Sequence, residues 1–262
     1  MSLVLAASIL DPGWGGLALS GLLMVAVLAV ALWSGVNLVK EGLVATARTT
    51  LQLLAVGFVL NWVFEQNTWW MIVAVLTLMT LVAGWTGSGR VERALRGTGP
   101  ALTVILMIVL AVTLLYVTRV VIGVTTVESR YFIPLGGMIL GSAMTAGSLA
   151  AQRFHDDARD GREAIEAALA LGATPAQATQ RATRRALVAA LTPMFNAMMI
   201  VGVVKLPGIM TGQMLGGSDP FEAAKYQIVV MFMLAFADGM TAIGVLRYLR
   251  GAAFTAAWQP RL

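Results

Sequence analysis

The chain has no cysteine and a single histidine among its 262 residues. Without thiols it can form neither a disulfide framework nor a thiolate metal site, and this composition excludes a high-affinity Cys/His iron site. Charge is also scarce, because only 12% of the residues are charged while 58% are hydrophobic. A soluble domain has about 25% charged and about 45–50% apolar residues. So large an apolar excess cannot be hidden in one core of this size, and it indicates a protein embedded in lipid.

Other absences narrow the class further. No Gly-x-x-x-x-Gly-Lys-Ser/Thr phosphate loop occurs anywhere, so the chain cannot hydrolyse ATP by itself. The N-terminus lacks a basic region and an Ala-x-Ala cleavage site, and we expect the first hydrophobic helix to serve as an uncleaved signal. The net charge is +5, but the basic residues are scattered over short loops. That distribution is typical of membrane topology signals and does not indicate nucleic-acid binding.

The hydrophobic stretches predict an all-α, polytopic membrane protein. A bilayer core about 30 Å thick needs roughly 20 apolar residues per helix, and seven stretches qualify, which together form a single transmembrane domain over residues 1–262. The predicted spans are Leu17–Leu38, Thr49–Phe64, Thr68–Trp85, Ala101–Ile122, Phe132–Ala151, Ala186–Val204 and Tyr226–Leu246. The second and third are short, and only Glu65, Gln66 and Asn67 separate them, which predicts a tight hairpin.

Lys and Arg in alternate loops predict the orientation, because cytoplasmic loops carry an excess of these residues. One side holds Lys40, Arg48, Arg90, Arg93, Arg96, Arg153, Arg159, Arg162, Arg181, Arg184, Arg185, Arg247, Arg250 and Arg261. The other side holds only Arg119, Arg130, Lys205 and Lys225. The first side is therefore expected to be cytoplasmic, with the N-terminus outside and the C-terminus inside.

A polar segment of about residues 153–185 is the only sizeable soluble element, and the predicted topology places it in the cytoplasm. Its first part is rich in helix formers, and Gly172 is expected to end that helix, as glycine commonly does just past a C-terminus. Thr174 can then cap a second helix, with Pro175 at its first position and Gln177 three residues after the cap. The segment is predicted to form a short projecting elbow made of a helix, a glycine turn and a capped helix.

The elbow sequence resembles the loop by which permeases of ABC transporters dock on their ATPase. The resemblance is carried by Glu166, Ala167, Ala168, Gly172, Thr174 and Pro175, which we predict to be the ATPase-coupling residues. The downstream half of the importer pattern, a Leu-Pro step, is absent, because Arg184 and Arg185 occupy those positions. This departure weakens an importer assignment and leaves an export reading intact.

Segments on both sides of the elbow extend the resemblance. Ala47–Leu53 (ARTTLQL), Tyr131–Gly141 (YFIPLGGMILG), Lys205–Gly217 (KLPGIMTGQMLGG) and Ala224–Met231 (AKYQIVVM) are similar to the FetB/YbbM-type permease family, over about residues 40–250. Members of that family are ABC permeases of bacterial inner membranes that pair with a separate ATPase and are associated with iron export. Plant relatives are linked to aluminium tolerance, with a different substrate proposed. The resemblance therefore implies a transporter class more firmly than a cargo.

Polar groups within the predicted spans are candidates for a translocation pathway, because they are costly in hydrocarbon. The candidates are Gln52, Asn61, Ser142, Thr145, Asn196 and Asp238. For the serine and threonine, hydrogen bonds between helices are the commoner role. Asp238 is the only carboxylate well inside a hydrophobic run; pairing with Arg247, a bond to polar backbone and a cation site all remain open. Methionine sulfur binds soft ions, but packing is its commoner role, and we assign no metal ligands.

A loop outside the sixth predicted span is the candidate exit gate. Leu206, Pro207, Gly208, Met210 and Gln213 lie in an apolar segment with two glycine-rich turns, which suggests a re-entrant or interface-lying segment. Gly137 and Gly141 follow the small-xxx-small spacing that lets helices approach closely, and we expect them to serve packing.

The sequence thus predicts the permease subunit of an ABC exporter of the bacterial inner membrane, acting by alternating access on a metal ion such as iron. The chain itself binds no cofactor in this reading, because ATP and Mg²⁺ belong to a separate ATPase. A permease homodimer with two ATPase chains is expected, since one such chain cannot enclose both ATP sites. Two rival hypotheses remain, namely an ion-coupled secondary carrier that uses Asp238, and a scaffold whose arginine-rich loop recruits a soluble protein.

Overall fold

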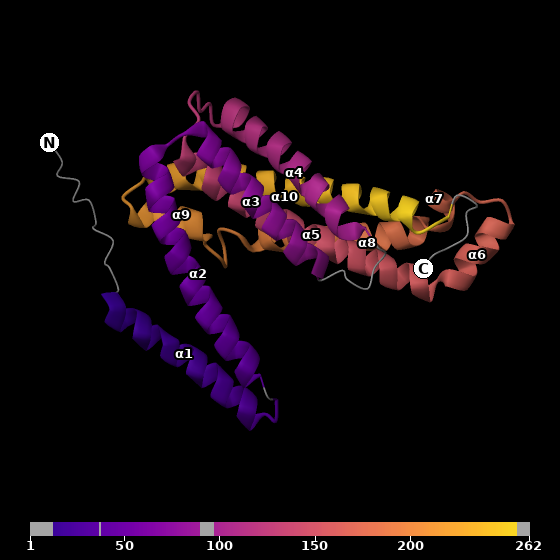
Figure 1. The fold of residues 1–262 in the computed structure, drawn as a ribbon, viewed down its shortest axis with the longest axis horizontal. Coiled ribbons are helices and arrows are strands. Elements are labelled where there is room, and N and C mark those ends of the chain that lie inside the picture. The colour runs from indigo at the N-terminus through magenta and orange to yellow at the C-terminus, as the bar shows by residue number, and fades with distance from the viewer. Residues whose placement is uncertain (1–12, 37, 90–96, 256–262) are drawn as a thin grey trace. The chain divides into compact units, whose positions relative to one another are not determined.

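A computed structural model describes residues 13–36, 38–89 and 97–255, and this part of the chain is almost entirely helical (Figure 1). Arg90, Arg93, Arg96 and Arg261, four of the charges that predict the orientation, lie outside the described residues. The helices are α1 (Gly13–Trp33), α2 (Val39–Gln66), α3 (Trp69–Gly89), α4 (Thr98–Tyr116) with a π-helical turn η1 (Val117–Val121), α5 (Ser129–Asp160), α6 (Arg162–Ala170), α7 (Pro175–Ala178), α8 (Gln180–Ile200), α9 (Gly208–Leu215) and α10 (Pro220–Ala252).

Within the described residues, six helices are long and apolar enough to cross a membrane, namely α1, α2, α3, α4 with η1, α5 and α10. The predicted all-α, polytopic membrane fold is therefore confirmed. The sixth predicted span, Ala186–Val204, is not among these six, because the helix there, α8, is displaced toward the polar segment. It begins at Gln180, so its first turns contain basic residues and lower its hydropathy. It ends at Ile200, and the next five residues form a turn closed by an isolated bridge between Val201 and Lys205.

Other helix ends also differ from the predicted ones. α2 begins at Val39, ten residues before the predicted start at Thr49, and has 28 residues, so the prediction of a short second span is wrong. Glu65 and Gln66 belong to this helix, and the link to α3 consists of Asn67, which adopts the left-handed conformation (φ 40°), and Thr68. α5 and α10 have 32 and 33 residues and outrun their predicted spans, because polar helix formers continue the backbone hydrogen bonding beyond the apolar run.

The contacts divide the chain into two compact units, one containing α1 and α2 and the other containing α3 to α8 and α10. In the first unit α1 packs on α2, and Gly42 lies against the side chain of Leu28. Val63 is the only buried residue among the described residues of these two helices. Almost all of their apolar side chains are thus exposed, as expected for helices that face lipid.

α5 is the central helix of the second unit, and it contacts α3, α4, α8 and α10. Its buried residues Ile139, Ala143, Gly147 and Ala150 recur at spacings of three and four, which places them along one face of the helix. α10 contributes Ala237 and Ala242 to the same core, and both are fully buried. Small residues allow helices to approach closely in a membrane. There the hydrophobic effect does not drive helices together, so van der Waals packing has to stabilise their contact.

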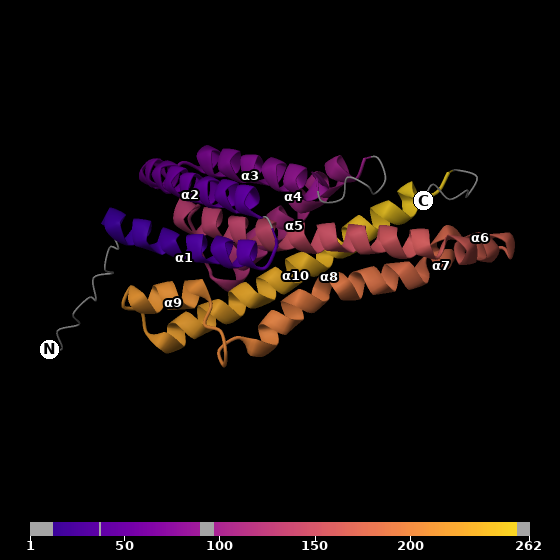
Figure 2. The same ribbon diagram turned by 90° about the horizontal axis from the view of Figure 1, so that it is seen from below.

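Both ribbon views show α5, α8 and α10 running side by side, with α6 and α7 at one end of this unit (Figures 1 and 2). α5 runs toward the α6–α7 end, and α8 returns from it along α5 (Figure 2). α8 therefore follows the same course as the membrane-spanning helices beside it, although its own hydropathy is lower. This arrangement places the predicted elbow at one end of the unit, directly on the end of its central helix.

Gly147 of α5 offers a test of this packing, because it lies against α4 and α10. A Cβ atom there would lie 2.9 Å from Cγ2 of Thr241 and 3.0 Å from Cδ1 of Leu102, whereas one at Gly141 would meet nothing within 4 Å. We expect Gly147→Val to lower the free energy of unfolding by about 1–3 kcal/mol through overpacking. SDS titration of the purified protein in mixed micelles measures this loss. Gly141→Val on the same helix is the matched control, and an equal loss there would contradict the packing argument.

Candidate functional site

The predicted elbow is present, and its glycine turn has a defined hydrogen-bond pattern. α6 ends at Ala170, and Gly172 follows with a left-handed φ of 89°. Its N–H donates to the carbonyl of Leu169 (2.9 Å), and the N–H of Ala173 donates to the carbonyl of Ala168 (3.0 Å). These two bonds form a Schellman motif, which satisfies carbonyls that the helix end leaves free and which favours glycine at this position. The prediction that Gly172 ends the helix is confirmed.

The second half of the elbow begins with the predicted capping box. The Thr174 hydroxyl accepts a hydrogen bond from the N–H of Gln177 (3.3 Å), and the Gln177 side chain accepts one from the N–H of Thr174 (2.8 Å). Pro175 occupies the first helical position, where its missing N–H costs nothing. The helix it starts, α7, is only four residues long, and Thr179 then leads into α8. A two-sided cap of this kind fixes the direction in which the chain leaves the turn.

One side of the elbow is anchored and the other is exposed. Ile165 and Thr179 are buried, whereas Glu166 and Ala167 are exposed and Leu171 is 90% exposed at the turn itself. Glu166 forms an ion pair with Arg162 one helical turn earlier (2.8 Å), which leaves its carboxylate at the surface. An acidic group, small residues and one large apolar side chain therefore form a projecting surface outside the apolar part of the unit.

α5 connects this surface to the membrane part without a break. Phe154 and Ala158 lie beyond the predicted end of the span at Ala151, and both are fully buried. A displacement of the elbow would therefore move α5 as a packed element, because closely packed helices shift as bodies and do not deform continuously.

A second feature lies in the middle of the unit, where Asp238 on α10 meets Ser142 on α5. The Ser142 hydroxyl donates to Oδ2 of Asp238 (2.9 Å), and Asp238 is only 4% exposed. Oδ1 of Asp238 and the hydroxyl of Thr241, one turn further along α10, are buried without a hydrogen-bond partner among the described residues. The sequence left an ion pair between Asp238 and Arg247 as one alternative. Among the described residues this ion pair is not formed.

Comparison with known proteins identifies the family. The profile of an uncharacterised protein family, UPF0014, matches residues 14–254. This chain belongs to UPF0014.

The chain is 39% identical to the protein ALUMINUM SENSITIVE 3 of Arabidopsis thaliana over 240 residues, which cover 90% of this chain and 86% of that protein. It is 39% identical over 236 residues to the UPF0014 membrane protein slr1647 of Synechocystis, with 90% and 89% covered. It is 32% identical over 230 residues to the probable iron export permease protein FetB of Escherichia coli, with 87% and 86% covered. No solved structure matches the chain.

The family match confirms the predicted resemblance, and the Synechocystis relative is described as a membrane protein. Together with the six apolar helices, this makes the chain a multi-pass membrane protein of UPF0014.

Two of the other predicted pathway residues of this UPF0014 chain have hydrogen bonds of their own, and two belong to the other compact unit. Thr145 donates to the carbonyl of Gly141 in its own helix (2.9 Å), and Asn196 is exposed on α8. Gln52 and Asn61 lie on α2, in the other compact unit; both are exposed, and Asn61 donates to Glu65 (3.1 Å). Within the second unit, the structure thus brings together only the Ser142–Asp238 pair from the predicted set.

The predicted exit-gate residues lie in and just before the short helix α9. Leu206 and Gly208 are exposed, while Pro207, Met210 and Gln213 are half-buried. α9 has eight residues and buries none of them fully. Such a short, partly covered helix fits an interface-lying segment, and its role as a gate stays a prediction.

The described residues hold no cluster of three or more His, Cys, Asp or Glu side chains that would suit a metal ion. His155 is half-buried on α5, and its Nδ1 atom has no partner among the described residues. A metal cargo would therefore meet isolated carboxylate, amide and thioether groups, and no resident metal site can be assigned to this part of the UPF0014 chain.

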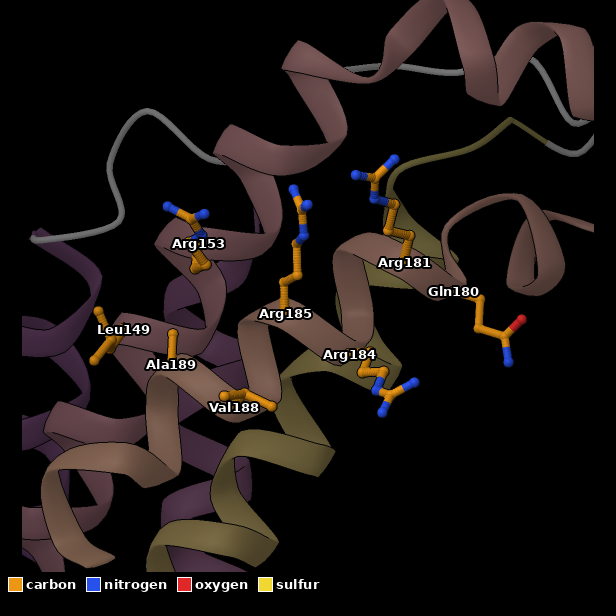
Figure 3. A pocket seen from close by; sticks show the side chains of 8 residues that line it. All are labelled: Leu149, Arg153, Gln180, Arg181, Arg184, Arg185, Val188 and Ala189. Atoms are coloured by element: carbon orange, nitrogen blue, oxygen red, sulfur yellow. The ribbon is translucent and has the colours of Figure 1, made fainter. Parts of the chain in front are cut away.

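Sequence reasoning missed one site feature. Arg153 of α5 and Arg181, Arg184 and Arg185 of α8 line a common groove next to the elbow (Figure 3). From the sequence they are interpreted as orientation charges, Arg184 and Arg185 also as a departure from the importer pattern, and the arginine-rich loop as the basis of the scaffold hypothesis, but they are not placed in one groove. A pattern in the sequence could have revealed the groove. On each helix an apolar residue lies four positions from a basic one, since Leu149 precedes Arg153 and Val188 follows Arg184.

The Ser142–Asp238 contact can be tested by a double-mutant cycle. We expect Ser142→Ala to lower the free energy of unfolding by about 1 kcal/mol when Asp238 is present and by clearly less in an Asp238→Ala background, since hydrogen bonds between membrane helices are worth about 0.6–1.7 kcal/mol. SDS titration in mixed micelles measures each variant. Thr145→Ala, which removes a hydroxyl bonded within its own helix, should cost the same in both backgrounds. Additive effects of Ser142→Ala and Asp238→Ala would contradict the contact.

Proposed function

We propose that this protein is the membrane-spanning permease subunit of an ATP-driven exporter of the ABC type. The observation that carries the proposal is the elbow. A rigid turn bearing Glu166 and Leu171 projects from the end of α5, the helix on which its whole unit is packed. This is the arrangement that a soluble motor needs to move helices in a membrane, because it joins an exposed docking surface to a packed lever.

The proposal requires an ATPase on a separate chain, because this sequence has no phosphate-binding loop. ATP and Mg²⁺ would be held by that partner. Two permeases with two ATPases form the simplest closed arrangement, since paired ATP sites match a two-fold symmetric pair of elbows. Closure of the ATPase pair would draw the two elbows together, and α5 and α8 would transmit the shift and expose the pathway alternately to each side. The elbow then faces the cytoplasm, in agreement with the excess of Lys and Arg on that side.

Iron or another metal ion is the proposed cargo, and the bacterial inner membrane is the proposed location. The support is the name of one relative, the probable iron export permease protein FetB, at 32% identity. Asp238 and Ser142 would provide oxygen ligands inside the membrane, and the segment of Leu206, Pro207 and α9 would close the exit.

A secondary carrier is the second candidate, and Asp238 is the observation in its favour. A carboxylate that is 4% exposed, with one oxygen unpartnered in the described part of the chain, is a natural site for a transported proton or cation. In that case flux would depend on an ion gradient and not on ATP.

Docking at the elbow can be tested by co-purification with the separate ABC-type ATPase that the proposal requires. We expect Glu166→Arg with Gly172→Arg to reduce the ATPase recovered by about tenfold or more, because a reversed charge and a bulky side chain in the centre of an interface are costly. The exposed Glu166–Arg162 pair contributes little stability, and the strain of a side chain at the left-handed Gly172 is confined to the surface turn, so the fold should survive.

The chain offers a matched control for this variant. Glu222 also forms a 2.8 Å ion pair, with Lys225, and Gly217 also has a left-handed φ of 88° and open surroundings. Glu222→Arg with Gly217→Arg should leave ATPase recovery unchanged. Equal recovery with the elbow variant and with the wild type would contradict docking at this surface.

Transport can be tested in proteoliposomes that contain this chain and its ATPase, with ferrous iron and other divalent ions as cargo. We expect flux that requires ATP and that stops with a non-hydrolysing ATPase variant. Flux that ignores ATP but stops with Asp238→Asn would instead establish the carrier. Complete absence of flux for every ion, with the ATPase bound and active, would contradict the proposed metal cargo and favour the scaffold hypothesis.

A further inference from the structure

A groove of about 1070 Å³ lies between α5 and α8, at the end of the unit that carries the elbow. Four arginines line it, Arg153 from α5 and Arg181, Arg184 and Arg185 from α8. Figure 3 shows the side chains of Arg153, Arg181 and Arg185 extending the same way, away from the apolar end of the groove. Three guanidinium groups from two helices are therefore available on one side of a single concave surface.

The local acidic residues leave this surface positively charged. Arg153 is paired with Asp157, whose Oδ1 lies 3.2 Å from its Nη2 atom. Asp157 and Asp160 line an adjoining smaller cavity with Arg181 and Arg185, but neither arginine reaches ion-pair distance of a carboxylate among the described residues. Arg184 is also unpaired in this part of the chain. Like charges this close repel one another, and an anion placed between them would relieve that repulsion.

The groove also has an apolar part, and it lies at the same level on both helices. Leu149 precedes Arg153 by four residues, and Val188 and Ala189 follow Arg184 and Arg185 by four. Four helical residues span about 6 Å, so on each helix the charges stand one turn beyond the apolar side chains. Because α5 and α8 run in opposite directions, both place their arginines on the elbow side and their apolar residues toward the middle of the unit.

This two-zone arrangement identifies the kind of ligand. A small soluble anion would contact the arginines and leave the apolar part of the groove in water. A phospholipid would satisfy both zones, with its phosphate among the guanidinium groups and its glycerol and first acyl carbons over Leu149 and Val188. The planar guanidinium group binds phosphate oxygens in pairs, and basic pockets between helices on the cytoplasmic side of membranes are suited to anionic headgroups.

We propose that the α5–α8 groove binds the phosphate headgroup of an anionic phospholipid. This proposal rests on the proposed function in one respect, namely that the end of the unit carrying the elbow faces the cytoplasm. The bound lipid would lie against the two helices that join the elbow, so it would link the occupancy of the groove to the position of α5 and α8. Neither the ATPase nor a metal cargo is needed for this binding.

Native mass spectrometry of the purified full chain tests the proposal, with titration of dioleoyl-phosphatidylglycerol against dioleoyl-phosphatidylcholine. We expect the anionic lipid to bind at lower concentration, and Arg181→Gln with Arg185→Gln to weaken it roughly thirtyfold, since each of the two basic residues contributes about 1 kcal/mol to contact with anionic lipid. Arg247→Gln with Arg250→Gln removes two charges from the end of α10 outside this groove and should leave the affinity unchanged. Val188→Glu places a carboxylate in the apolar part and should weaken binding while all four arginines remain.

Five outcomes would overturn the proposal. Equal affinity for the two lipids, or equal weakening by the Arg247 and Arg250 control, would mean that general charge attraction explains the binding. Displacement of phosphatidylglycerol by an equal concentration of glycerol 3-phosphate would identify a site for soluble phosphates. Unchanged lipid binding with loss of the ATPase in the Arg181 and Arg185 variant would assign the groove to the protein partner. If lipid binding fails while the ATPase still co-purifies with the wild type, only the lipid proposal is wrong and the proposed function stands.

Discussion

The close packing of α5 on α10 is the interaction on which the rest of this structure depends. Small residues form its centre, with Ala143 and Ala150 on one helix and Ala237 and Ala242 on the other, all fully buried. In lipid these contacts have no water to drive them, so van der Waals contact at short range has to hold the helices together. The same contact brings Ser142 to Asp238 and keeps α5 rigid as far as the elbow. The membrane interior and the proposed docking surface are thus parts of one packed body.

The sequence was most informative where local chemistry decides the structure. Gly172, Thr174, Pro175 and Gln177 specify a Schellman turn and a capping box through hydrogen bonds within a few residues, and both were predicted correctly. The apolar runs likewise predicted seven spans, and six of them match helices in the described residues that are long and apolar enough to cross a membrane. Helix ends were less predictable, because α2, α5 and α10 continue through polar residues that are good helix formers. For α8 the prediction placed the apolar run correctly but the helix several residues too late, since Gly202 allows an early turn.

Contacts between distant residues were beyond the reach of the sequence. Asp238 was recognisable as an isolated carboxylate, but its partner lies 96 residues away on α5. Arg247, nine residues along the same helix, was an equally reasonable candidate until the packing of α5 and α10 was known. The arginine groove was missed for the same reason, because it exists only when α8 returns along α5. Residues counted one by one as orientation charges form a concave binding surface once the two helices lie side by side.

The lengths of the two central helices have a mechanical consequence. α5 has 32 residues and α10 has 33, which correspond to about 48–50 Å of helix, whereas the hydrocarbon core is about 30 Å thick. With modest tilt, each must extend well past the lipid. Leu171 belongs to the elbow that follows α5, so a push on it would pass through α6 and Gly161 to the end of α5 and produce a torque about the point where α5 enters the bilayer. A small sideways step by a soluble motor would be converted into rotation of the buried half, which is a means of opening a passage without breaking a single backbone hydrogen bond.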